Sequence, residues 1–128
     1  MYKRQEIKLN LSQRVNTPAE GLYEVVLAVT VTATTSDKTA YLAEVHQAGL
    51  FAIAGLQDAQ LQGLLNTLCP HSLFPYASQT ITSLVAAGGF PPLVLQPINF
   101  EQVYQQRLQE AQAKAQAEAG DMEVQGNA

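Results

Sequence analysis

The chain has 128 residues, a formal net charge of -4 and a sequence pI near 5.0. Hydrophobic residues make up 47% of it and charged residues 14%, a balance typical of one folded globular domain. Lys and Arg together number only seven, so the clustered positive charge that phosphate binding needs is missing, which excludes nucleic acid as a partner. We interpret the basic residues near the N-terminus as solvated charges at a strand edge: Lys3, Arg4, Lys8 and Arg14.

Three features of the sequence indicate the cellular compartment of the protein. The N-terminus has no apolar run behind it, so we expect no signal peptide. The longest apolar stretch, residues 81–98, is interrupted by Gly and Pro, so we expect neither a transmembrane helix nor direct membrane insertion. Cys69 is alone and cannot form an intramolecular disulfide. Together these features predict a cytoplasmic protein.

The middle of the chain is almost free of charge. Residues 39–100 contain no Lys or Arg and only two acids, Glu44 and Asp58. A chain of this size buries roughly two-thirds of the surface that its unfolded form exposes, so one small core is expected to leave part of such a segment uncovered. The pattern therefore favours a self-associating subunit, an apolar surface kept for a partner, or both.

The first half of the chain alternates apolar and polar residues with a period of two, which predicts β-strands. We expect a short strand around residues 7–11, a second over residues 22–32 and a third over residues 39–50. Residues 35–38 form a polar turn, and such short connections imply antiparallel pairing. One face of the second strand is expected to be apolar: Tyr23, Val25, Leu27, Val29 and Val31.

The second half has helical spacing. We expect one helix around residues 61–68 that ends before Pro70, and another that has Pro75 in its first turn and ends at Gly88. Residues 90–97 should be extended, and Asn99 should cap a third helix, with Gln102 completing a capping box. Strands followed by helices predict an α+β domain over residues 1–119, with a disordered tail at residues 120–128.

Several segments, in this order and at near-constant spacing, resemble the protein-export chaperone family SecB. The match covers about residues 6–108, and its strongest part is the run FPPLVLQPINF at residues 90–100. A typical SecB begins with a further edge strand and a long crossover, which this sequence lacks before Glu6. The other matching segments are residues 22–27, 29–33, 42–45, 49–56, 69–70 and 73–77.

The resemblance implies an antiparallel sheet with two main helices on one face, assembled as a homotetramer that is a dimer of dimers. It implies an ATP-independent chaperone, without enzymatic activity, cofactor or metal, that binds unfolded precursor proteins and delivers them to the motor ATPase SecA. The family's client-contacting positions match one strand and one helix face: Ile7, Leu9, Leu11, Phe100, Val103, Tyr104 and Leu108. Leu42 and Glu44 match the sheet-face pair that contacts SecA in relatives.

Two other functions remain open from the sequence. One is a SecB-like chaperone dedicated to a toxin-antitoxin partner, and the other is an oligomeric domain that binds a small apolar ligand under the helix that begins at Phe100. An enzyme is disfavoured because residues as close in sequence as Cys69 and His71 rarely present a thiol and its base in the correct geometry. A zinc site is disfavoured because it needs three or four convergent ligands, and only Cys69, His46, His71 and scattered acids are available. We therefore expect Cys69 to be a buried structural residue and His46 to be a solvated residue of the sheet face.

Overall fold

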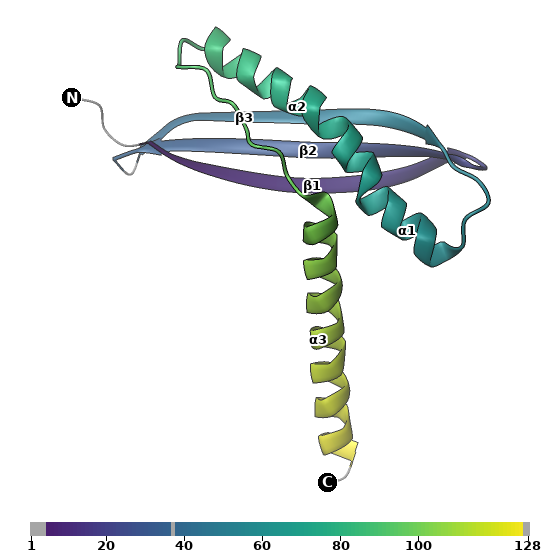
Figure 1. The fold of residues 1–128 in the computed structure, drawn as a ribbon. Helices are drawn as coiled ribbons and strands as arrows, with labels where there is room; N and C mark the ends of the chain where they lie inside the picture. Colours follow the sequence, from purple (N-terminus) through teal and green to yellow (C-terminus); the bar gives the residue numbers. More distant parts are fainter. Residues whose placement is uncertain (1–4, 37, 127–128) are drawn as a thin grey trace.

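The computed structural model describes residues 5–36 and 38–126, and it has an α+β architecture. Three strands form an antiparallel sheet in the order β1-β2-β3, and the helices follow them in the sequence (Figure 1). The elements are β1 (Gln5–Ala19), β2 (Leu22–Thr35), β3 (Lys38–Ala52), α1 (Asp58–Asn66), α2 (Leu68–Ala87) and α3 (Phe100–Gly126).

The sheet confirms the predicted strands and their faces but is longer than expected. β1 and β3 have 15 residues each and β2 has 14. In the register of the sheet, Leu11 of β1 lies opposite Val29 of β2, and Val29 lies opposite Val45 of β3. Because side chains alternate between the two faces of a strand, these three residues share one face, and the polar residues between them share the other.

The core lies between this face and α2, which crosses the sheet over β2 and β3 (Figure 1). β-branched and aliphatic side chains suit a pleated surface, and their burial is the main stabilising term. On β2 the predicted stripe is almost fully buried, except for the half-buried Tyr23. The core residues of β2 and α2 are Val25, Leu27, Val29, Val31, Cys69, Leu73, Phe74, Ala77, Ile81 and Val85.

The first helix ends before Pro70 and the second ends at Gly88, as predicted, but the second helix begins earlier than the sequence predicted. α1 ends at Asn66, and α2 begins at Leu68, so Pro70 lies in the first turn of α2 and Pro75 lies inside it. A proline is tolerated in a first turn because the N–H that it lacks has no partner there, whereas an interior proline costs about 3 kcal/mol. Burial of Leu73 and Phe74 around Pro75 offsets this cost. Tertiary packing has therefore overridden the local signal.

Residues between α2 and α3 are extended, as predicted, and run back across the helix-covered face (Figure 1). Phe90 packs on Tyr41 of β3, with 4.8 Å between the ring centroids. The Thr82 hydroxyl of α2 donates a hydrogen bond to the carbonyl oxygen of Leu93. Leu93 and Leu95 are partly buried against the core, so the segment is fixed along α2.

α3 begins as predicted but continues further. The Gln102 N–H donates to the Asn99 side-chain oxygen at 3.0 Å, which confirms Asn99 as the N-cap. The sequence predicts disorder from Gly120, whereas α3 extends to Gly126; residues 127–128 lie outside the described part. Ala, Glu and Gln favour helix, which explains the continuation. The helix projects away from the sheet (Figure 1), and none of the described helices is long and apolar enough to span a membrane.

Candidate functional site: an apolar groove and an open sheet face

The predicted client-contacting residues of β1 share the face of the sheet on which the helices lie. Ile7 and Leu9 are 40% and 36% exposed, while Leu11 is partly buried against the core. β1 is an edge strand, and α2 covers β2 and β3 rather than β1. Ile7 and Leu9 therefore remain available on the surface, whereas Leu11 belongs to the packing around the base of α3.

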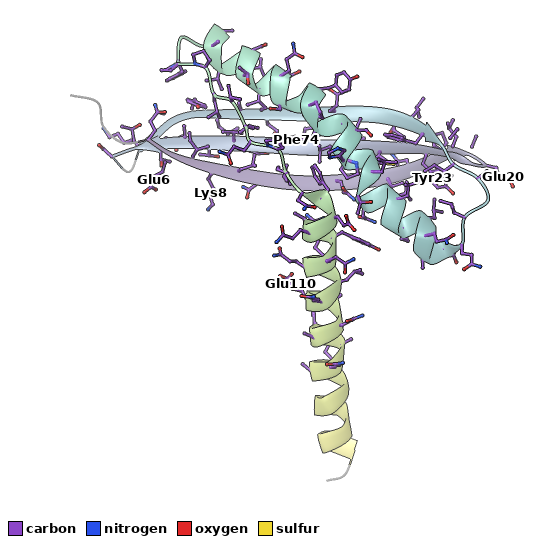
Figure 2. The ribbon with its side chains drawn as sticks, in the orientation of Figure 1. Glu6, Lys8, Glu20, Tyr23, Phe74 and Glu110 are labelled. Atoms are coloured by element: carbon purple, nitrogen blue, oxygen red, sulfur yellow. The ribbon has the colours of Figure 1, made fainter. Side chains whose placement is uncertain are left out.

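Phe100 is a core residue. Its exposed fraction is 6%, and its ring packs edge-on against Phe74 of α2 with the centroids 5.9 Å apart. Figure 2 shows Phe74 where α2 crosses the sheet. The resemblance implies a place for Phe100 on a lid over the client groove, but its burial makes it the anchor that attaches α3 to the domain. A polar substitution there removes core packing first, so Phe100 cannot report on client binding alone.

The other predicted residues of α3 lie beside this anchor. Val103 and Tyr104 are half-buried and, with Leu11, line a hollow at the base of the helix, while Leu108 is 38% exposed one turn beyond Tyr104. The hollow has a volume of only about 10 Å³. Because small-molecule sites typically occupy about 300–1,000 Å³, this hollow is too small for a lipid-like ligand. The structure thus brings Leu11, Val103 and Tyr104 together.

A larger apolar groove runs between α2 and the extended segment, and Phe100 is the one predicted client-contacting residue that lines it. Two adjoining hollows of about 370 and 330 Å³ share His71 and Ile98. Prolines at positions 91, 92 and 97 keep the segment out of a helix, and this pattern is the signal that could have located the groove. We call this feature the α2 groove; it is lined by Thr67, Leu68, His71, Phe74, Pro75, Ser78, Gln79, Thr82, Val94, Leu95, Pro97, Ile98, Asn99, Phe100 and Glu101.

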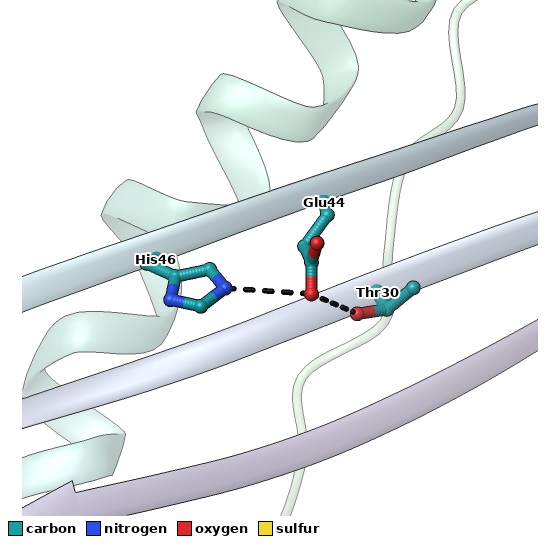
Figure 3. A network of polar contacts seen from close by, with 3 residues as sticks. All are labelled: Thr30, Glu44 and His46. Atoms are coloured by element: carbon teal, nitrogen blue, oxygen red, sulfur yellow. Dashed lines mark hydrogen bonds and ion pairs between the residues drawn. The ribbon is translucent and has the colours of Figure 1, made fainter.

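The opposite face of the sheet is open and carries the pair predicted to contact SecA. Leu42 is 61% exposed, and the Glu44 side chain is about half exposed on the same face. One Glu44 carboxylate oxygen lies 3.4 Å from His46 Nε2 and accepts a hydrogen bond from the Thr30 hydroxyl at 3.2 Å (Figure 3). These two contacts hold the carboxylate flat on the sheet surface beside Leu42, and His46 is the solvated residue of the sheet face that the sequence predicted.

Cys69 is buried, with 1% of its surface exposed, in the first turn of α2. Removal from solvent raises the pKa of its thiol, because the apolar surroundings disfavour the charged thiolate. His71 of the same helix is exposed. A protonated, buried thiol is a poor nucleophile, which confirms the structural role predicted for Cys69.

Comparisons with known proteins agree with this architecture. Residues 2–111 match the family model of the preprotein translocase subunit SecB. The chain is 49% identical to the protein-export protein SecB of Alkalilimnicola ehrlichii over 125 residues, which is 95% of this chain and 66% of that protein. It is also 49% identical to the protein-export protein SecB of Stenotrophomonas maltophilia, with 96% of this chain and 72% of that protein covered.

A solved structure shows the same fold. It is a SecB-like chaperone of Mycobacterium tuberculosis in complex with a peptide from the HigA1 antitoxin. The TM-score is 0.56 at 16% identity, over 75% of this chain and 72% of that one. The matched family model covers most of the chain, and the curated relatives are nearly half identical to it. The chain therefore belongs to the SecB family of protein-export chaperones, which are not enzymes.

Proposed function

We propose that this chain binds unfolded precursor proteins in the cytoplasm, keeps them competent for translocation and delivers them to SecA. The observation that carries the proposal is the α2 groove, an open apolar channel of several hundred Å³ on the surface of a SecB-family domain. Two of the lining residues are exposed apolar side chains, since Leu68 and Val94 are 53% and 78% exposed. Tyr76 of α2, outside the lining, is 63% exposed.

Such a surface suits a chaperone that binds many clients without ATP. Each Å² of client apolar surface removed from water contributes about 25 cal/mol, and ordering of the client offsets much of this gain. Individual contacts are therefore weak and tolerant of sequence, and affinity accumulates when one client chain engages several sites. Binding of the unfolded state alone holds the client unfolded by mass action.

One variant tests the groove directly. Val94 lines the α2 groove and is 78% exposed, so Val94→Glu should leave the fold intact while placing a carboxylate against the client. Desolvation of that charge should weaken client binding about tenfold. The measurement is calorimetry or light scattering with two unrelated unfolded proteins.

The matched control is Gln96→Glu, which makes the same charge change two residues away at an exposed position that does not line the groove. Equal client affinity of the two variants would contradict the groove as the client site.

Binding of only one partner, instead of both unrelated clients, would favour a dedicated toxin-antitoxin chaperone. The solved complex of a SecB-like chaperone with an antitoxin peptide is the observation that favours this second function. That chaperone is 16% identical to this chain, whereas the export proteins are 49% identical to it.

The homotetramer is also part of the proposal. α2 contains no Asp, Glu, Lys or Arg over 20 residues, yet Leu68, Tyr76 and Leu84 are 53%, 63% and 49% exposed. A helix with an exposed, uncharged outer side is typical of a subunit interface. We expect multi-angle light scattering at micromolar concentration to give a dimer or tetramer; a single species near 13.8 kDa would contradict this expectation.

The open sheet face is proposed as the SecA docking surface, with Leu42 and Glu44 at its centre. An apolar side chain that is 61% exposed beside a fixed carboxylate has no structural role in the subunit itself. The surface lies on the face opposite to α2, so client binding and SecA binding use different sides of the sheet.

A further inference from the structure

A small hollow, separate from the α2 groove, lies on the open sheet face. In the register of the sheet, Ser12, Ala28 and His46 lie opposite one another in one row across the three strands, and Arg14 lies opposite Val26 in the next row on this face. The hollow forms where the small side chain of Ala28 leaves space between longer neighbours. We call it the Arg14 hollow; it has a volume of about 140 Å³ and is lined by Ser12, Gln13, Arg14, Val26, Ala28 and His46.

The side chain of Arg14 is restricted at the rim of this hollow. Val26 is only 6% exposed, although α2 packs on the other face of the sheet. Directly opposite residues of an antiparallel pair have Cβ atoms about 4.5–5.5 Å apart, so the aliphatic stem of Arg14 covers Val26 while its guanidinium stays in water. A side chain that already packs along its stem loses less freedom when a ligand binds to its charged end.

The guanidinium of Arg14 has no acidic partner in the part of the chain that the structure describes. The ion pair of the open face joins His46 to Glu44, and no described acid lies within 4.0 Å of Arg14. Glu24, the next acid along β2 on this face, accepts a hydrogen bond from the Asn16 amide at 3.3 Å instead. No Asp or Glu lines the hollow, so its positive charge is unmatched within the subunit.

We propose that the Arg14 hollow receives an acidic side chain of the protein that docks on the open sheet face, which is SecA in the proposed function on which this inference rests. A guanidinium is planar and donates two parallel hydrogen bonds to a carboxylate, so an Asp or Glu side chain is its best match. The Ser12 hydroxyl lines the same hollow and can donate another. His46 also lines the hollow and turns its Nε2 toward Glu44 (Figure 3), so the imidazole separates the Glu44 carboxylate from the incoming acid.

The docking surface is then bipolar. Glu44 on β3 requires a basic group of SecA, and Arg14 on β1 requires an acidic one. The two residues are two strands apart across the sheet and four residues apart along it. At about 4.8 Å per strand and 3.3 Å per residue, their Cα atoms are roughly 16 Å apart. The docking segment of SecA should therefore present a base and an acid at about this separation, whereas a uniformly basic segment would leave Arg14 unmatched.

Charge reversal tests the hollow. Arg14→Glu should weaken SecA binding about tenfold, because it places one carboxylate against another. The matched control is Lys8→Glu, which makes the same change in charge on the same face of β1, six residues away (Figure 2). That separation is about 20 Å, more than twice the screening length of about 8 Å at 0.15 M salt, so the control should lose about twofold or less. Titration calorimetry is the measurement, with circular dichroism to verify folding.

Filling the hollow tests its shape without any change in charge. Ala28→Leu places a larger apolar side chain on the floor of the hollow and should weaken SecA binding about fivefold, because the incoming acid would lose its space and its contact with Arg14. Thr34→Leu is the control. It adds an apolar side chain on the same face of β2, six residues away and outside the lining, and should leave the SecA affinity unchanged.

Carbodiimide coupling identifies the occupant. The reagent joins a primary amine to a carboxyl group as an amide, takes up the water that is lost as it becomes a urea, and does not couple a guanidinium. In the complex of SecA with the Arg14→Lys variant, the introduced amine should be coupled to an Asp or Glu of SecA, which mass spectrometry of the digested product locates. The parent protein keeps Lys8 but has no amine in the hollow, so it should not give this product.

The outcomes separate this inference from the proposed function. A parent protein that does not bind SecA would overturn the docking surface and the hollow together. SecA binding that Glu44→Lys weakens and Arg14→Glu leaves unchanged would overturn the hollow alone, as would equal losses in Arg14→Glu and Lys8→Glu or the absence of a coupled carboxyl group. If millimolar inorganic phosphate shifts the amide resonances around Arg14 while Arg14→Glu binds SecA as tightly as the parent, the hollow belongs to a free anion and not to SecA.

Discussion

Replacing Phe100 by alanine is expected to destabilise the domain by about 3–5 kcal/mol, the range for deletion of a buried aromatic ring. Phe100 is 6% exposed, and its ring meets Phe74 edge-on at 5.9 Å. Its loss removes the apolar burial, the aromatic contact and the anchor of α3 together, and the remaining cavity adds to the cost. Urea unfolding at fixed protein concentration measures the change in the free energy of unfolding.

The control for this prediction is Leu108→Ala on the same helix. Leu108 is 38% exposed, so its truncation should change the free energy of unfolding by no more than about 0.5 kcal/mol. If Phe100→Ala were as stable as Leu108→Ala and lost only client binding, the ring would act in the α2 groove alone and our assignment to the core would be wrong. Phe74→Ala and the double variant then measure the coupling of the pair, expected at about 0.5–1.5 kcal/mol.

Reversing Glu44 to lysine is expected to weaken SecA binding by about 1–3 kcal/mol while client binding stays unchanged. Glu44 is held on the open face by Thr30 and His46, so its charge is presented in a fixed position beside Leu42. Because a carboxylate steers a basic partner through a field that salt screens, the parent affinity should also fall as ionic strength rises. Titration calorimetry with SecA at two salt concentrations measures both effects.

Glu110→Lys is the matched control for this reversal. It makes the same change in net charge on exposed α3, far from the open sheet face (Figure 2). Equal SecA affinities of the two variants would remove Leu42 and Glu44 from the docking surface.

Several features could be predicted from the sequence because local physics determines them. Alternation with a period of two placed Val25, Leu27, Val29 and Val31 on one face of β2, and the structure buries them. The helix cap at Asn99 was predictable because its side chain acts on a backbone N–H three residues away. The ordered segments of residues 90–100 likewise indicated the family, which the comparisons show.

Only the tertiary structure decided where α2 begins, what Phe100 does, and where the groove lies. Local rules correctly ended α1 before Pro70 but placed the start of the next helix at Pro75, whereas packing of Leu73 and Phe74 on the sheet carries α2 through both prolines. Helical spacing predicts that Phe100 and Tyr104 share one face of α3. Phe100 is nevertheless a core residue and Tyr104 is only half-buried, because Phe74 covers only the start of α3. The α2 groove lies between residues up to 34 positions apart in the chain, Thr67 and Glu101, and such long-range placement depends on burial against the sheet rather than on neighbours in sequence.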